Sequence, residues 1–414
     1  MKTKMIKSTT MAVLGLLLSG CLLFSNCSDD DKKVDLDPGT STSELLVKNF
    51  SEAPTMDGAI DDMWSTAQKL ETSVVVPSSL GARNTYYNED GIGEENLDIF
   101  EAYEGESIDF TMRSGTVGSD IYFLIEWDDA DDSKDRQSWY FDATAKLWKQ
   151  EHKYANAAND KFYEDKFAFL FPIGTVDGFS SSTCFASCHS TGGTITNPKD
   201  KHTRHYLKTA GQKIDMWHWK RVRGTHNDRV DDQRIWSVDA PFTSASNGRG
   251  GDPGVTGDGT QSGYSDNKQT LNNGIADVSV PKYVVPGGTD YYWIPTADLG
   301  TTAKLVTAVD ANGILTYSGG TINPAGDTGY DQGTGNKRFP SILTRDFLGA
   351  RGDVEVKAEY TGTGWICEVK RKLNTGDADD VVFDPSAELP FGFAIFDNAA
   401  IAHAIKPGLT LIFE

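Results

Sequence analysis

The sequence lacks the short catalytic motifs of several common enzyme classes. Its 414 residues contain no Gly-rich phosphate-binding loop, no Gly-x-Ser-x-Gly elbow and no His-Glu-x-x-His pair. Each of these motifs holds a phosphate cradle, a nucleophile or a pair of zinc ligands at a defined spacing, so their absence argues against the corresponding chemistry. Carboxylates are plentiful, which leaves room for a catalytic carboxylate pair. We nevertheless expect a protein that is not an enzyme in its own right.

Positive charge is also in short supply. The chain has 39 lysines and arginines against 60 aspartates and glutamates, which gives a formal net charge of -21. A surface of this sign repels phosphate backbones and anionic lipid headgroups. We therefore expect no nucleic-acid partner, and we interpret the charge as a contribution to solubility.

Regular helical patterns are scarce, and the 41 glycines suit a chain with many turns. Apolar and polar residues instead alternate, most clearly at residues 120–127, where the odd-numbered side chains from Ile121 to Trp127 share one face. Further strands are expected at residues 107–112, 166–172, 353–360, 365–370 and 390–398. The sequence predicts an all-β fold, an antiparallel β-sandwich with long loop insertions and few short helices.

The apolar run that follows the N-terminal lysines is too short for a permanent membrane helix and is typical of a signal peptide. A lipoprotein-like cleavage box precedes both Cys21 and Cys27, and an acidic run follows the second. We predict a lipoprotein signal peptide over residues 1–27, with Cys27 lipidated and Cys21 as the alternative. Residues 28–45 are polar and predict a flexible tether. The folded domain, residues 46–414, would then be lipid-anchored to the outer membrane, on its periplasmic or surface-exposed side.

A long Gly-rich segment interrupts the strand pattern. Residues 239–335 are rich in Gly, Asp, Ser, Thr and Asn, which predicts an irregular insertion with short strands at residues 282–285 and 291–294. Three of its acidic residues could hold calcium: Asp252, Asp258 and Asp266. No calcium-loop spacing with a closing glutamate occurs, so we expect a solvated loop.

Cysteine is rare, yet two cysteines lie four residues apart and a histidine follows directly: Cys184, Cys188 and His189. Covalent haem attachment needs two thiols for thioether bonds and an adjacent imidazole for the iron, usually as Cys-x-x-Cys-His. Here one extra residue separates the thiols. The motif predicts haem. The alternatives are a disulfide between the two cysteines, or a zinc site completed by His202 or His205.

A second group of residues suited to ligand binding begins at Trp217. Trp217 and Trp219 lie two residues apart and are followed by cations that include Arg221 and Arg223. The indoles could wall a flat apolar ligand while the guanidinium groups neutralise its carboxylates. The alternative is a strand with both tryptophans in the core and the cations in solvent.

Further segments occur in a familiar order along the chain. They are Asp57-Gly58 with Trp64, Glu126-Trp127-Asp128-Asp129, Tyr163-Glu164-Asp165-Lys166, Asp215-Met216-Trp217-His218-Trp219-Lys220, Asp231-Asp232, Arg371-Lys372-Leu373 and Phe396-Asp397-Asn398. Together with the cysteine motif, this order resembles the haem-binding domain family of the ethylbenzene dehydrogenase gamma subunit, also described as the haem-binding domain of dimethylsulfoxide-reductase-like enzymes. The resemblance covers about residues 46–414 apart from the insertion. It implies a β-sandwich that holds one haem and moves electrons.

The resemblance also implies a ligand set. In the molybdenum enzymes of the group, a b-type haem is held between a methionine and a lysine. Here the cysteine motif stands where the methionine-bearing loop would be, and His403 stands at about the place of the lysine. We therefore predict His189 and His403 as the axial pair of a c-type haem, with a b-type haem as the alternative. The alternatives for the distal ligand are His202, His205, Met216, His218 and Lys406.

Two imidazole ligands would leave no open site on the iron, so we expect an electron carrier rather than a catalyst. Its partner would be a redox protein in the periplasm or at the cell surface. In this arrangement Trp217 and Trp219 pack beside the haem, and the cations Lys220, Arg221 and Arg223 bind its propionates.

A second family offers a non-catalytic alternative. The opening Asp57-Gly58-Ala59-Ile60-Asp61 with Trp64 is similar to that of family 9 carbohydrate-binding modules, which share a sandwich fold. In such a module Trp217 and Trp219 would stack on sugar rings, and a disulfide would join Cys184 and Cys188. A histidine after the second cysteine is not needed there, so His189 favours haem.

Overall fold

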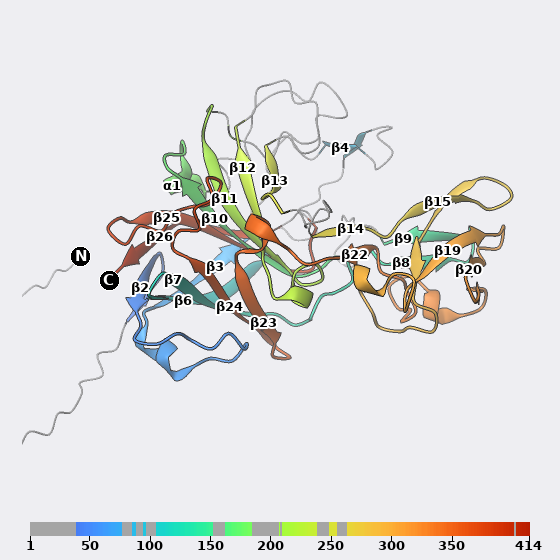
Figure 1. The fold of residues 1–414 in the computed structure, drawn as a ribbon, viewed down its shortest axis with the longest axis horizontal. Helices are drawn as coiled ribbons and strands as arrows, with labels where there is room; N and C mark the ends of the chain where they lie inside the picture. The colour runs from blue at the N-terminus through green and yellow to red at the C-terminus, as the bar shows by residue number, and fades with distance from the viewer. Residues whose placement is uncertain are drawn as a thin grey trace, which may run out of the picture. The chain divides into compact units, whose positions relative to one another are not determined.

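The computed structural model describes residues 39–76, 85–87, 94–96, 105–151, 162–183, 207, 209–237, 248–254, 263–400 and 403–414. All of them fall within one unit, residues 38–414, which is built almost entirely from strands (Figure 1). The all-β prediction is therefore confirmed. No helix in these ranges is long and apolar enough to cross a membrane.

Thirteen strands form one continuous sheet. They are β1 (Thr40–Ser41), β2 (Glu44–Asn49), β3 (Lys69–Val75), β6 (Ser107–Val117), β7 (Asp120–Asp128), β10 (Lys166–Ile173), β11 (Lys213–Lys220), β12 (Asp231–Trp236), β13 (Arg249–Gly251), β23 (Glu355–Tyr360), β24 (Gly364–Lys372), β25 (Leu389–Phe396) and β26 (Ala404–Phe413). The order across the sheet is β13-β12-β11-β10-β25-β26-β2-β6-β7-β24-β23, and β3 pairs with β1, β26 and β6. Most neighbours are antiparallel, but β2 runs parallel to β26 and β6.

The sheet folds over on itself, so that β10 and β11 pack against β7 and β24. The ring centroids of Phe123 and Phe169 are 5.3 Å apart, and those of Trp127 and Trp219 are 6.3 Å apart. All four side chains are buried. Edge-to-face and tilted aromatic pairs of this kind add to the free energy gained by burying their area. The two halves of one sheet therefore form the two layers of the predicted sandwich.

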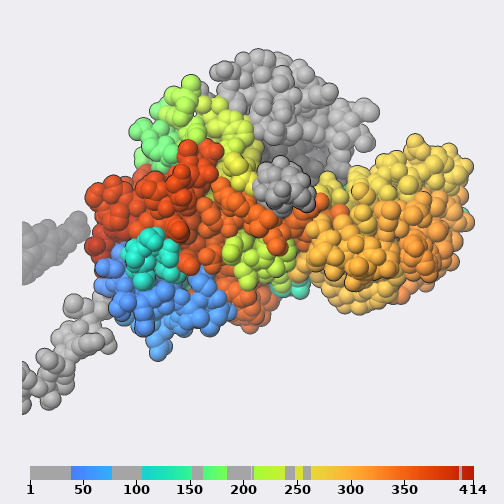
Figure 2. Space-filling view, in the orientation of Figure 1, coloured from blue at the N-terminus to red at the C-terminus, as the bar shows by residue number. Residues whose placement is uncertain are grey.

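The insertion forms a smaller β-structure with its own core. Its strands are β14 (Tyr264–Asp266), β15 (Gln269–Asn272), β16 (Asp277–Val280), β17 (Tyr283–Val284), β18 (Ile294–Pro295), β19 (Lys304–Val309), β20 (Leu315–Tyr317), β21 (Gly320–Ile322) and β22 (Ile342–Thr344). The hairpin of β8 (Trp139–Asp142) and β9 (Leu147–Gln150) supplies Trp139 and Trp148 to this core, where they meet Phe339. In the space-filling view the strands of the insertion, coloured yellow to orange, form one contiguous body (Figure 2). Sequence reasoning missed this regularity because the largest apolar side chains come from outside the insertion.

The remaining elements are short. They are β4 (Thr85–Tyr87), β5 (Glu94–Asn96), α1 (Phe179–Ser182) and the 3-10 turns η1 (Asp62–Thr66), η4 (Thr225–Asn227), η5 (Thr296–Asp298), η6 (Thr328–Tyr330) and η7 (Gly349–Gly352). Helix α1 ends at Thr183, whose side chain packs onto Gly392 of β25. A Cβ atom at Gly392 would lie only 2.8 Å from the Cβ of Thr183, so this contact requires glycine. Thr183, the last described residue before Cys184 in the sequence, therefore lies on β25.

One buried ion pair joins the two layers. The guanidinium Nη1 of Arg371, on β24, donates to Asp215 Oδ2, on β11, at 2.8 Å, and both side chains are fully buried. The same guanidinium donates to the carbonyl of Val381 and lies over the ring of Trp217 at 4.9 Å. Arg371 therefore has its charge and its donors satisfied inside the core.

We expect Arg371→Leu to lower the free energy of unfolding by about 3–5 kcal/mol, because it leaves the Asp215 carboxylate buried without its cation. Urea unfolding followed by tryptophan fluorescence measures the loss. The double variant Arg371→Leu/Asp215→Leu should recover a large part of it, since no charge is then left unpaired. A double variant as unstable as the single one would contradict this account.

Candidate functional site

The candidate site lies on the face of β10, β11 and β25 that points away from the aromatic core. Successive residues of a strand point to opposite faces, and cross-strand partners share a face. Lys166 is paired with Lys220 and Phe396, and these three residues therefore share the outer face. The next row on this face contains His218 and two alanines.

The floor of the outer face is built from small residues. Ala168 and Ala394 are cross-strand partners, and Gly392 pairs with Leu170 in the following row. All four residues are buried. Small side chains next to one another leave a flat strip of backbone, which suits close approach of a planar ligand.

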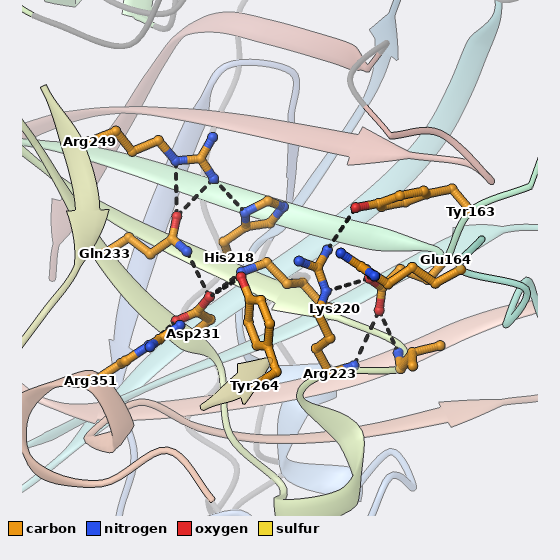
Figure 3. Close-up of polar contacts among 12 residues, drawn as sticks. Tyr163, Glu164, His218, Lys220, Arg223, Asp231, Gln233, Arg249, Tyr264 and Arg351 are labelled. Carbon is orange, nitrogen blue, oxygen red and sulfur yellow. Dashed lines mark hydrogen bonds and ion pairs between the residues drawn. The ribbon is translucent and has the colours of Figure 1, made fainter. Parts of the chain in front are cut away.

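A buried polar cluster adjoins this floor (Figure 3). Its members are Tyr163, Glu164, Lys166, His218, Lys220, Arg223, Asp231, Gln233, Arg249, Tyr264 and Arg351. Asp231 accepts hydrogen bonds from Lys220, from Arg351 Nε at 2.6 Å and from Gln233 Nε2 at 2.7 Å. Glu164 accepts from Arg223 Nε at 2.6 Å. The two carboxylates thus hold the cations in place from both ends of the cluster.

The cluster holds more positive than negative charge. It contains five cationic side chains and two carboxylates, an excess of three positive charges. Burial would raise the pKa of the Asp231 carboxyl, but Lys220 and Arg351 lower it overall, so it is ionised. Buried charge of one sign is costly unless it is compensated. The excess therefore favours an anionic ligand.

Lys166 is the least compensated of these cations. It is fully buried, and its ammonium donates to the carbonyl of Ala400 at 3.0 Å and lies over the rings of Tyr163 and Phe396. None of the carboxylates that the structure describes forms an ion pair with it. Burial lowers the pKa of the Lys166 ammonium well below its usual range, and the charge of Arg223 lowers it further.

His218 supplies an unused donor to the same site. The guanidinium of Arg249 lies 3.0 Å from His218 Nδ1, and because arginine only donates, Nδ1 is the acceptor and Nε2 carries the proton. Nε2 is buried and has no hydrogen-bond partner. Burial and the charge of Lys220 lower the pKa of the imidazole well below its usual range, so the ring is neutral. This arrangement suits a hydrogen bond to an acceptor atom better than ligation of a metal, where the second nitrogen usually donates to a carbonyl or carboxylate.

The structure places the predicted site residues on both faces of the sheet. Trp217 and Trp219 point into the core and are fully buried, so they neither wall the outer face nor offer a stacking surface for a sugar. The reason is the pleat, which turns each tryptophan away from the face that carries Met216 and His218. Alternation alone does not say which face is the core.

The predicted cations also separate. Arg223 belongs to the polar cluster, whereas Arg221 forms a two-pronged ion pair with Asp132 at 2.6 and 2.9 Å and lies over Trp365. Arg221 therefore lies outside the polar cluster. Lys220 belongs to the cluster, together with Arg223. The members that sequence reasoning missed are Tyr163, Glu164, Lys166, Asp231, Gln233, Arg249, Tyr264 and Arg351. A lysine at the head of the apolar run of β10 was the one local signal.

His403 lies at the outer face, just before β26. Its ring stacks on Phe396 with centroids 4.6 Å apart, and Phe396 also contacts the ring of His218 at 5.4 Å. Lys406 pairs with Phe393, a core residue, and so starts from the opposite face of β26. Of these two candidates for the distal ligand, His403 is the one on the face with His218.

The other predicted residues lie outside the described ranges or carry no ligand signal. Outside the described ranges are Cys21, Cys27, Cys184, Cys188, His189, His202, His205 and Asp258. Of the calcium candidates, Asp266 is exposed, and Asp252 is buried and paired with Arg234 at 2.9 Å.

The segments that carry the family resemblance meet in space. Asp129, Asp165 and Asp397 come from three of them, and each has a carboxylate oxygen within 4.8 Å of the others. Burial, and then the charge of Asp397, raise the pKa of Asp129 to about 7. Backbone N–H groups of Ser133 and Asn398 donate to Asp165 at 2.8 and 3.0 Å. These acidic residues thus fix the loop ends beside the outer face.

Comparison with known proteins identifies the family. Residues 61–406 match the protein family described as ethylbenzene dehydrogenase, and since this is most of the chain, the protein belongs to that family. No curated protein matches the sequence. Among solved structures, a family 9 carbohydrate-binding module from Caldicellulosiruptor kristjanssonii in complex with glucose is similar, with 8% identity, a TM-score of 0.25, and coverage of 90% of this chain and 96% of that chain. A likeness at this level carries no argument about function.

We expect Lys166→Met to stabilise the ligand-free protein by roughly 1–3 kcal/mol while weakening anion binding, because it removes a buried charge without a counter-charge. In the unfolded chain the ammonium keeps its usual pKa near 10.5, whereas in the folded protein the pKa is lower. The unfolded state therefore holds more protons between the two pKa values, and the stability of the wild type should rise with pH in that window.

The pH-dependent rise should be smaller in Lys166→Met than in the wild type, which urea unfolding at several pH values measures. Lys372→Met, at an exposed lysine of β24, is the control and should leave the slope unchanged. Equal slopes for wild type and Lys166→Met would show that Lys166 is not a buried, uncompensated cation.

Proposed function

We propose that the protein is an extracytoplasmic electron carrier that binds one haem on the outer face of β10, β11 and β25. The observation that carries the proposal is the contact between Thr183 and Gly392, because Thr183 directly precedes the Cys184-x-x-x-Cys188-His189 motif in the sequence and lies on the face that also bears His403. Membership of the ethylbenzene dehydrogenase family supports the proposal.

Three features of the outer face fit a haem. The adjacent small residues Ala168 and Ala394 leave a flat floor for one edge of a macrocycle, beside Gly392, which Thr183 covers. The buried excess of positive charge suits two propionates, and it comes from Lys166 and Arg249, since Lys220 and Arg223 are ion-paired with Asp231 and Glu164. The unpartnered Nε2 of His218 supplies one more donor. These residues would bind and orient the cofactor and exclude water from it.

Cys184 and Cys188 would hold the porphyrin through thioethers, and His189 and His403 would ligate its iron. A haem held in this way would supply reversible one-electron transfer rather than a site for a substrate. The chain itself then contributes binding and electrostatics. Anchored at Cys27, with Cys21 as the alternative, it would exchange electrons with a redox protein at the outer membrane.

The full chain, secreted in a host with cytochrome c maturation, should give a c-type pyridine haemochrome. Cys184→Ala/Cys188→Ala should lose haem that survives denaturation, and His189→Ala and His403→Ala should each lose the low-spin spectrum. His226→Ala is the matched control, because the His226 ring contacts the carbonyl of Arg345 outside the polar cluster, and it should keep the wild-type spectrum.

Two other results are informative. A b-type haemochrome would leave the haem pocket in place but replace the two thioethers by a disulfide between Cys184 and Cys188. Folded wild-type protein without any haem, grown with adequate iron, would overturn the proposal.

A further inference from the structure

A second cluster of carboxylates lies in the interior, apart from the polar cluster on the outer face. Asp232 belongs to β12, Asp353 follows η7, and Asp380 lies in the loop between β24 and β25. One oxygen of each residue lies within 4.8 Å of one oxygen of the others. Asp232 is fully buried and Asp380 is 3% exposed. Three distant segments therefore converge on one acidic point inside the protein.

The oxygens of this cluster have few donors in the rest of the chain, and the carboxyls of Asp232 and Asp353 lie close enough to share a hydrogen bond if one of them is protonated. Both carboxylate oxygens of Asp232 are buried without a hydrogen-bond partner, and so are Asp353 Oδ1 and Asp380 Oδ1. The second oxygen of Asp380 accepts a hydrogen bond from Thr375. Buried polar atoms are almost always paired, so a group of unpaired acceptors aimed at one point indicates a missing donor or cation.

No cation of the described chain forms an ion pair with the cluster, although the charge of Arg371 acts on Asp232 and Asp353 and lowers their pKa values in part. Arg371 is nearby, but its guanidinium is used by Asp215 at 2.8 Å and by two backbone carbonyls. Arg234 is likewise used by Asp252 at 2.9 Å and Asp379 at 3.1 Å. The three carboxylates therefore share only the indirect charge of Arg371, whose hydrogen bonds go to other groups.

Two more buried acceptors surround the cluster. Asp215 Oδ1 and Asp252 Oδ2 are also without partners, and the charges of both residues act on Asp232. The atoms of the described cluster that could ligate a metal are all carboxylate oxygens. A hard cation such as calcium takes about six to eight oxygen ligands and tolerates irregular geometry, whereas softer metals prefer nitrogen and sulphur.

We propose that Asp232, Asp353 and Asp380 form a calcium-binding site. The ion would join β12, the segment before β23 and the loop before β25, and would add to the backbone hydrogen bond from Val230 to the Val354 carbonyl at 3.1 Å that already links the first two. It is independent of haem, because the cluster includes none of the residues that bind the cofactor in the proposed function.

Proton sharing is the competing explanation. Burial and the charge of Asp215 raise the pKa of Asp232 well above its usual range, and burial and Asp380 raise that of Asp353 to about 7. Without a cation the carboxylates would therefore retain protons. The two explanations differ in what calcium does to the protein.

The test uses the full chain after dialysis against a chelator, titrated with calcium chloride in a calorimeter and melted with and without the ion. One calcium ion should bind per chain and raise the melting temperature, because it binds the folded state preferentially. Asp232→Asn and Asp353→Asn should each weaken binding by about tenfold or more. Asp353 is half-buried, so its variant remains informative if Asp232→Asn does not fold.

Asp384→Asn is the matched control, since Asp384 is exposed in the same loop and accepts hydrogen bonds from Ser386; it should bind like the wild type. Folded wild type with no heat and no melting shift would overturn the proposal. It would also be overturned if Asp129→Asn abolished binding while Asp232→Asn and Asp353→Asn left it intact, because the ion would then occupy the Asp129 cluster.

Discussion

The strict alternation of side chains along β10, β11 and β25 is the constraint on which core and site both depend. One set of positions supplies Phe167, Phe169 and Trp219 to the aromatic core, and the residues between them supply Lys166 and His218 to the outer face. A shift of one residue would exchange the two sets. The tightly packed aromatic side therefore fixes the register with which the polar side is assembled.

The structure also buries positive charge in one place and negative charge in another. Cations exceed carboxylates around Lys166 and Arg223, and carboxylates exceed cations around Asp232. Each group carries a free-energy cost that hydrogen bonds within the chain only partly offset. A bound group of opposite charge would offset these costs, as the proposed propionates and the proposed calcium ion would.

The strands could be predicted from sequence because their signal is local. Alternation marked residues 120–127 and 365–370, and both lie in strands of the main sheet. The polar cluster could not be predicted, because Arg249 and Arg351 reach it through pairings between segments far apart in the chain. Trp217 and Trp219 were assigned to the ligand because period-two patterns do not distinguish the core face from the outer one. Asp232 belongs to one of the segments of the family resemblance but gave no sign of metal binding, since its partners are set only by the fold.

Asp231 and Asp232 are neighbours on β12, yet one holds the cations Lys220 and Arg351 and the other faces the acidic cluster. The cationic cluster and the acidic cluster thus lie on opposite faces of the same strand. Deleting or inserting one residue in β12 before Asp231 would exchange the faces of the two side chains, so that Asp231 would point toward the acidic cluster and Asp232 toward the cations. Among natural variants of this chain we therefore expect insertions and deletions in loops but not in β12, even where β12 tolerates substitutions.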